Sequence, residues 1–164
     1  MNHLATSKED ISAASRDLIK ENGWAAVSIR AVASRCSVSA GTIYNYYESK
    51  ADLLSDTIES IWHEIFFHPE DEQVFHDVES CISWIYERLE YGNRQFPGFF
   101  SLHSFGFMRD EKTSGKKRMM KTWGHILNGL CEVLGNDPKV RADVFDQEFT
   151  EKKFADILFS LILV

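Results

Sequence analysis

The fold is decided by the stretch SIRAVASRCSVSAGTIYNYYESKADLL, which runs from Ser28 to Leu54. Ser28 can cap a short helix that ends near Cys36-Ser37, and Ser39 can cap a second helix of about eight residues. Two such helices joined by a tight turn at residues 36–38 have the dimensions of a helix-turn-helix unit. The stretch therefore predicts a unit in which one helix packs against the rest of the protein and the other is exposed to a partner.

The predicted helix after Ser39 has two contrasting faces. The apolar face, expected to pack inward, consists of Ala40, Ile43 and Tyr47. The polar face, expected to meet a partner, consists of Gly41, Thr42, Tyr44 and Asn45. Hydroxyl and amide groups there can reach phosphate oxygens and base edges, and no acidic group on this face would repel phosphates. A glycine in so short a helix costs about 1 kcal/mol relative to alanine, and close approach of another backbone at Gly41 would explain it.

A longer helix is expected from Ser49, because Ser49 and Asp52 have the spacing of a capping box. Apolar residues then follow at helical spacing as far as Phe66. Free backbone N–H groups, the positive end of the helix dipole and Lys50 lie together at its start. This end of the helix is predicted to bind phosphate.

Residues 23–54 resemble the DNA-binding head of the tetracycline-repressor (TetR) family of bacterial regulators. The likeness lies in Gly23, in Ser28-x-x-x-Val32-Ala33 where the family usually has Thr-x-x-x-Ile-Ala, and in a longer run after the turn. That run is Val38-Ser39-x-Gly41-Thr42-Ile43-Tyr44-x-Tyr46-Tyr47-x-Ser49-Lys50-x-x-Leu53-Leu54. The sequence departs from the family pattern at Ser37, where glycine is frequent, and at Tyr46, where histidine is frequent.

The resemblance implies a role for each matching residue on DNA. The residues expected to hold phosphates are Ser28, Ser39, Thr42, Tyr44 and Lys50, and those expected nearest the bases are Asn45 and Tyr46. We add Arg30 for its positive charge and Gly41 for close backbone approach to this set of DNA-binding residues. The alternative is a three-helix packing unit with a solvated outer face.

Composition is compatible with this interpretation only because the charge is unevenly distributed. The 164-residue chain has a net charge of −7, which opposes nucleic-acid binding as a whole. Residues 27–50 hold three basic residues against Glu48 alone, whereas residues 61–164 hold 12 basic and 17 acidic residues. An anionic partner is therefore expected at the N-terminal end. Three scattered cysteines and the lack of a leader-like start or a membrane-length apolar run predict a soluble, cytoplasmic protein.

The rest of the chain also shows helical periodicity, so we predict an all-α fold. A capping box at Ser7 and Asp10 opens a first helix that Asn22-Gly23 ends, and further helices are expected after His68-Pro69, from Pro97, over 119–135 and from Thr150. We assign residues 1–48 to a helix-turn-helix DNA-binding domain. Residues 49–164 are assigned to a helical effector-binding and dimerisation domain.

The second domain holds 17 of the 21 aromatic residues. An apolar effector pocket and an ordinary core explain this enrichment equally well. The candidate pocket residues are Trp84, Phe99, Phe100, His103, Phe107, Met120 and Trp123. His125 is a further polar candidate, although a histidine in an apolar stretch is more often part of the core. The effector is expected to be a small hydrophobic or amphipathic molecule.

No pattern in the sequence predicts catalysis, a metal site or a cofactor. A glycine-rich phosphate loop, HExxH and GxSxG are all absent from the sequence. His63, His68 and His76 have loose metal-ligand spacing, but histidines and carboxylates at a helix break more often form a solvated surface. We therefore expect a protein that acts by binding.

These observations lead to one hypothesis and one alternative. We expect a homodimeric bacterial transcription factor, a repressor, that binds a palindromic double-stranded DNA operator and is released by its effector. A TetR-like dimer usually pairs two C-terminal helices per subunit, and this chain has residues for the first only. We expect that the natural protein has a further helix. The alternative is that the apolar end pairs with its own copy. The alternative function is a helical ligand-binding or scaffold protein without operator binding.

Overall fold

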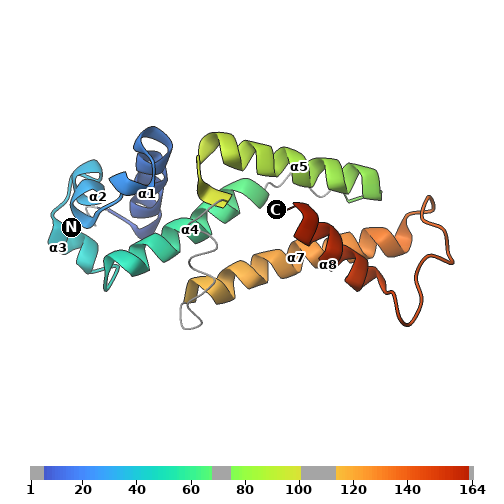
Figure 1. The fold of residues 1–164 in the computed structure, drawn as a ribbon. Coiled ribbons are helices and arrows are strands. Elements are labelled where there is room, and N and C mark those ends of the chain that lie inside the picture. The colour runs from blue at the N-terminus through green and yellow to red at the C-terminus, as the bar shows by residue number, and fades with distance from the viewer. Residues whose placement is uncertain (1–5, 68–74, 101–113, 163–164) are drawn as a thin grey trace.

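The computed structural model describes residues 6–67, 75–100 and 114–162. Within these ranges all regular structure is helical and no strand occurs, which confirms the all-α prediction. Figure 1 shows an N-terminal head of short helices, from which one long helix leads into a body of longer helices. In the described part of the chain, no helix has both the length and the apolar character that crossing a membrane requires.

The head begins with α1 (Lys8–Asn22), which starts and stops where the sequence predicts. The Asp10 backbone N–H donates to the Ser7 side chain at 3.0 Å, and the Ser7 N–H donates to the Asp10 carboxylate at 2.9 Å, so the capping box is complete. Gly23 ends the helix with a φ of 77°, a conformation that L side chains rarely adopt. The short 3-10 helix η1 (Trp24–Ala26) follows.

The helix-turn-helix consists of α2 (Ile29–Arg35) and α3 (Ala40–Tyr44), with Ser28 and Ser39 as their caps. Ser37 takes the left-handed conformation in the turn, with a φ of 57°, so serine serves here where the family often has glycine. The expected length of the second helix is wrong, because α3 has five residues. The N–H groups of Asn45 and Tyr46 bond to carbonyls three residues back, which closes the helix in tight turns.

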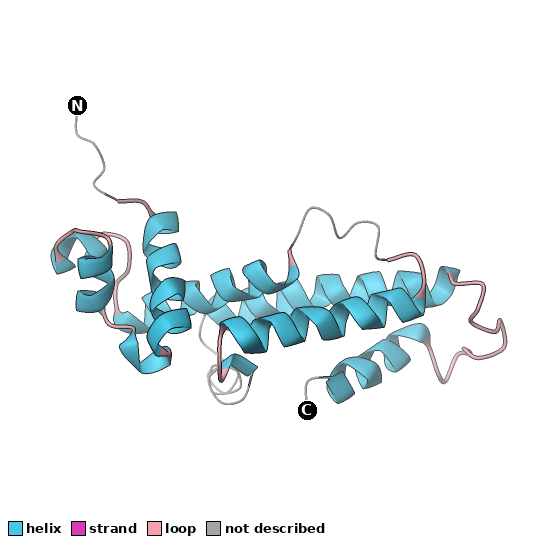
Figure 2. Cartoon of the chain, turned by 90° about the horizontal axis from the view of Figure 1, so that it is seen from above, coloured by secondary structure: helices cyan, strands magenta, loops and turns pink. Residues whose placement is uncertain are grey.

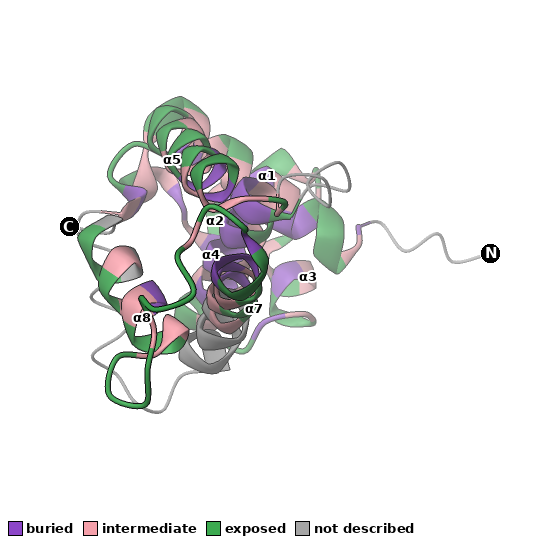
Figure 3. Ribbon diagram, turned by 90° about the vertical axis from the view of Figure 1, so that its right-hand side faces the viewer, coloured by how far each residue is buried: buried purple, intermediate pink, exposed green. Residues whose placement is uncertain are grey.

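The long helix α4 (Lys50–Phe66) belongs to both head and body. Ser49 caps it as predicted, but the reciprocal half of the second capping box is wrong. The Asp52 carboxylate accepts from the backbone N–H of Glu48, at 3.3 Å, instead of that of Ser49. Figure 3 shows α4 in the middle of the molecule with its buried surface toward its neighbours. It packs against α1 in the head and against α5 and α7 in the body.

The body contains α5 (Val78–Gln95), α7 (Ser114–Asn136) and α8 (Glu151–Ile162). From above, α5 and α7 run alongside the distal part of α4, and α8 lies beyond α7 (Figure 2). Ala155 of α8 is fully buried, whereas Ile157 and Leu161 are 49% and 68% exposed. These two apolar side chains of α8 are therefore only partly covered by the rest of the described chain.

Candidate nucleic-acid interface and effector pocket

The face of α3 predicted to meet a partner is on the surface. Gly41, Tyr44 and Asn45 are exposed, with Tyr44 at 56%, whereas Ile43 and Tyr47 are buried. Thr42 is half-buried, and its hydroxyl lies 3.0 Å from that of Ser39. Ile43 and Tyr47 thus pack inward and Gly41, Tyr44 and Asn45 face outward as predicted, whereas Ala40, like Thr42, is half-buried. The outer face carries a phenol and a carboxamide, which are groups that suit DNA backbone and base edges.

Serine side chains cap the helices around this face. Each hydroxyl oxygen accepts a backbone N–H three residues ahead: Ser28 from Ala31, Ser39 from Thr42 and Ser49 from Asp52, all at 3.1 Å. Because the cap uses the oxygen as an acceptor, a serine O–H is left to donate to an incoming phosphate oxygen. The same residues therefore stabilise the helix ends and can face the DNA backbone.

The cations of the head differ in availability. Lys50 is exposed as the first residue of α4, where it adds to the positive end of the helix dipole. Arg30 is exposed on α2. Arg35 is held instead by Glu21, with a guanidinium-to-carboxylate distance of 2.7 Å, and this hydrogen bond holds the pKa of Glu21 below its usual range. Arg30 and Lys50 are thus the better candidates for phosphate.

The two tyrosines after α3 are tied into the head. The Tyr46 hydroxyl donates to the carbonyl of Thr6 at 2.6 Å, and its side chain is half-buried. The Tyr47 hydroxyl donates to the Asp56 carboxylate at 2.8 Å, and burial together with Asp56 raises the pKa of Tyr47 far above its ordinary value. A neutral Tyr47 therefore anchors the end of the outer helix to α4.

The body contains a cavity of about 710 Å³ between the end of α4, α5 and α7. Aromatic side chains on its wall are Phe66, Phe67, Phe75 and Trp84, and polar ones are His76, His125, Asn128, Glu132 and Asn136. The Phe67 ring stacks on the His125 ring, with centroids 6.1 Å apart, and on the His63 ring, with centroids 4.8 Å apart. Such a wall suits a ligand with both apolar and polar parts.

Of the pocket residues predicted from sequence, Trp84 lines this cavity. Phe99 does not: it is fully buried at the junction of head and body, where it packs against Trp24 and Trp62. Phe100 packs against Trp62 as well. His103 and Phe107 lie outside the described residues, as do the side chains of Met120 and Trp123. Phe99 and Phe100 thus pack into the core at this junction.

Sequence reasoning missed most of the cavity wall. A usable signal was the run Ile65-Phe66-Phe67, an aromatic helix end directly before the His68-Pro69 break. The pairing of that end with His125 could not be read from spacing. Among the residues that the structure describes, no group of three His, Cys, Asp or Glu side chains is placed to hold a metal ion.

The comparison with known families gives a match in the head. The family described as bacterial regulatory proteins, tetR family, matches residues 11–57. This range contains both helix-turn-helix helices, their caps and Lys50. No curated protein matches the sequence.

Solved structures match nearly the whole chain. One is the transcriptional regulator FadR from Bacillus subtilis in complex with stearoyl-CoA, at 20% identity and a TM-score of 0.64, covering 95% of this chain and 83% of that one. A TetR transcription regulator from Haloarcula marismortui has 19% identity and a TM-score of 0.64, covering 94% and 81%. NalD, the secondary repressor of the MexAB-OprM multidrug efflux pump in Pseudomonas aeruginosa, has 16% identity and a TM-score of 0.53, covering 95% and 80%. At these identities the likeness establishes a shared fold.

Proposed function

Because this chain belongs to the tetR family of bacterial regulatory proteins, we propose that it represses transcription in the cytoplasm by binding a palindromic operator as a homodimer. The observation that carries the proposal is the exposed outer face of α3 beside Lys50, within the residues that match the family. Two heads related by two-fold symmetry would place this helix in successive major grooves. The protein acts by binding and not by catalysis.

Each DNA-facing residue takes one of two roles in this proposal. Phosphate contacts come from the serine caps at Ser28 and Ser39, from Thr42 and Tyr44, and from Arg30 and Lys50. Gly41 allows the backbone of α3 to approach the duplex. Asn45 is the leading base reader, because it is exposed and a carboxamide can bond an adenine edge twice. Tyr46 joins it at the bases through its ring, while its hydroxyl stays on Thr6.

The cavity in the body is the proposed effector site. Its four aromatic side chains and its histidine, amide and carboxylate groups support a small amphipathic effector. Phe66, at the end of α4, lines the cavity, and Lys50 begins the same helix, which spans about 25 Å at 1.5 Å per residue. An effector that shifts the end of α4 would change the spacing of the two heads and lower DNA affinity.

The homodimer is proposed on the exposed apolar residues of α8. Ile157 and Leu161 are large hydrophobic residues with about half or more of their surface in water. Covering such side chains in a symmetric contact is favourable. Sedimentation at several concentrations tests this, and a monodisperse monomer at micromolar concentration would contradict the dimer.

Selection of duplexes from a random library tests the function as a whole. We expect near-palindromic sequences and a logarithm of affinity that falls linearly with the logarithm of salt concentration. A protein that shows no duplex preference at any salt concentration would instead be a helical ligand-binding protein without an operator.

A further inference from the structure

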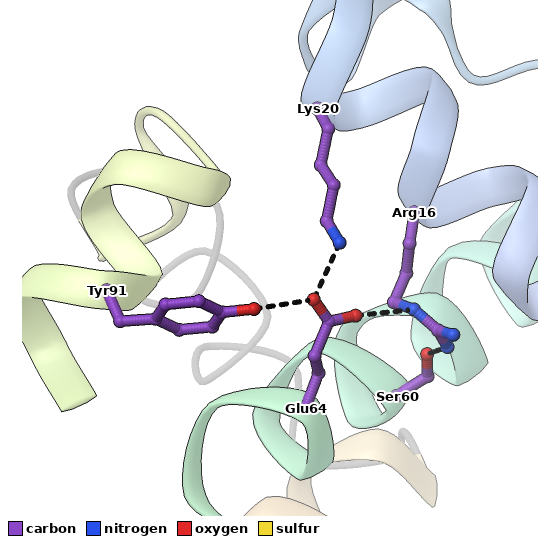
Figure 4. A network of polar contacts seen from close by, with 5 residues as sticks. All are labelled: Arg16, Lys20, Ser60, Glu64 and Tyr91. Carbon is purple, nitrogen blue, oxygen red and sulfur yellow. Dashed lines mark hydrogen bonds and ion pairs between the residues drawn. The ribbon is translucent and has the colours of Figure 1, made fainter.

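A single carboxylate stands where the head meets the body. Glu64, near the end of α4, forms an ion pair with each of two α1 cations. Its Oε2 lies 2.9 Å from Arg16 Nε, and its Oε1 lies 2.6 Å from Lys20 Nζ. From the body, the Tyr91 hydroxyl of α5 donates to Glu64 Oε1 at 3.2 Å. Figure 4 shows these groups from α1 and α5 converging on Glu64 of α4.

The surroundings hold this contact together. The side chains of Glu64, Arg16 and Lys20 are each between 21% and 29% exposed, so the ion pairs are partly shielded from water. The Lys20 ammonium also lies 5.0 Å from the ring centroid of Phe96, which is fully buried. Burial and the nearby Glu64 carboxylate raise the pKa of Tyr91, which keeps its hydroxyl protonated and able to donate.

The contact is the inner end of a polar seam between α1 and α4. Residues four apart share one face of a helix, and the cations of α1 meet polar groups spaced by four on α4. Lys8 Nζ lies 3.1 Å from Asp56 Oδ1 at the outer end, and Arg16 also contacts the Ser60 hydroxyl. Glu64 also bonds a body helix other than its own, through Tyr91 of α5.

We propose that Glu64 is a positioning residue for DNA binding, which fixes the angle of the head relative to the body by joining α1, α4 and α5. The proposal rests on the function proposed above, since a dimer must hold two heads at a half-site spacing of about 34–36 Å. Without the carboxylate, Arg16 and Lys20 would be like charges four residues apart on α1 that have lost their shared counter-charge, which is unfavourable. The head would then sample angles that miss one half-site.

The test compares Glu64→Gln with Glu87→Gln in the full chain. Glu87 is exposed on α5, so its variant makes the same charge change without removing the carboxylate that Arg16, Lys20 and Tyr91 contact. The readouts are hydrogen exchange along α1 and affinity for a duplex that the wild-type protein selects from a random library. We expect Glu64→Gln to speed exchange in α1 several-fold and to weaken duplex binding about tenfold, because hydrogen bonds to a charged group are lost. Glu87→Gln should match the wild type in both.

Rescue separates positioning from simple stability. The double variant Lys20→Glu with Glu64→Lys restores an opposite-charge pair and the net charge of the cluster, so we expect it to regain most of the lost affinity. Should Glu64→Gln fail to fold, Tyr91→Phe removes one hydrogen bond and keeps the ring, and we expect it to weaken duplex binding about two- to threefold.

Two negative results have different meanings. A wild-type protein that selects no duplex would overturn the proposed function itself. If the wild-type protein selects a duplex and Glu64→Gln binds that duplex as tightly, the positioning role alone is overturned. The same holds for Tyr91→Phe where it takes the place of Glu64→Gln. Loss of melting temperature without loss of affinity of the folded protein would also overturn it.

Discussion

The head and the body of this protein build their sites in opposite ways. In the head, the proposed DNA-binding residues come from one continuous stretch, residues 28–50, and short-range hydrogen bonds such as those of Ser28 and Ser39 shape it. In the body, the cavity joins Phe67 to His125 and Trp84, which come from three helices far apart in the sequence. A site made of local contacts can be predicted from a sequence, whereas a site made by packing depends on the whole fold.

The largest effect on the free energy of unfolding is expected at the junction, where residues of the head and of the body pack together. Trp62 of α4 is 2% exposed and packs against Phe66 of its own helix and against Phe99, which in turn stacks on Trp24 of the head. We expect Trp62→Ala to lower the free energy of unfolding by about 3–5 kcal/mol, through lost burial and a cavity. Denaturant unfolding measures the change.

Tyr86→Ala is the matched control, because Tyr86 is an aromatic residue of the body that is 56% exposed. Its cost should stay within about 0.5 kcal/mol, as for most surface substitutions. Equal effects of the two variants would show that the junction is not the shared core of head and body.

A smaller effect is expected from two capping residues: Asp137 in the body, which bonds the start of another helix, and Ser39 in the head, which caps its own helix. The buried carboxylate of Asp137 accepts the N–H of Val78 at 2.9 Å and that of Lys139 at 2.8 Å, which fastens the start of α5 to the end of α7. We expect Asp137→Ala to cost about 2–3 kcal/mol of unfolding free energy. Ser39→Ala, which removes a local cap, should cost about 1 kcal/mol.

Unfolding of both variants, with the exposed Asp143→Ala as a control, checks this order. A larger loss for Ser39→Ala would mean that the head depends on its caps more than the body depends on its long-range contacts, which is the reverse of the comparison drawn above.

The next prediction separates two roles within the head. Lys50→Ala should weaken binding to all duplexes about equally and reduce the salt dependence, because our proposal places Lys50, at a helix N-terminus, on a phosphate. Asn45→Ala should cost about 1–3 kcal/mol at particular base pairs only. Binding profiles over a duplex library measure both, and Asn22→Ala, exposed at the end of α1, is the control. The same profile for both variants would contradict the role assignment.

The residues show why the two regions differed in predictability. Serine caps, the Gly23 stop and the two faces of α3 follow from interactions within four residues, so the sequence predicts them. The length of α3 could not be predicted, because it depends on a choice between hydrogen bonds to the third and the fourth preceding carbonyl. Glu64 also escaped prediction. A lone carboxylate on a helix is usually solvated, and its partners Lys20 and Tyr91 lie 44 and 27 residues away.

The smallest effect involves no change in stability and compares the three thiols. Cys81 of α5 is fully buried, and burial raises the pKa of its thiol to about 11. Cys36 in the head and Cys131 on α7 are half-buried, so a reagent can reach them, although burial raises the pKa of each thiol as well. Since the thiolate is the reactive form, about one Cys81 thiol in a thousand is reactive at pH 8, and steric access is blocked as well.

We therefore expect iodoacetamide at pH 8 to modify Cys36 and Cys131 well before Cys81 in the native protein. All three should react at similar rates in denaturant, where their pKa values return to the ordinary range near 8.5. Raising the pH toward 11 should still leave modification of Cys81 slow, because the fully buried thiol is also out of reach of the reagent. Mass spectrometry of the peptides gives the three rates. If Cys81 in the native protein were modified as fast as Cys36, the body would have to open often enough that burial gives Cys81 no protection.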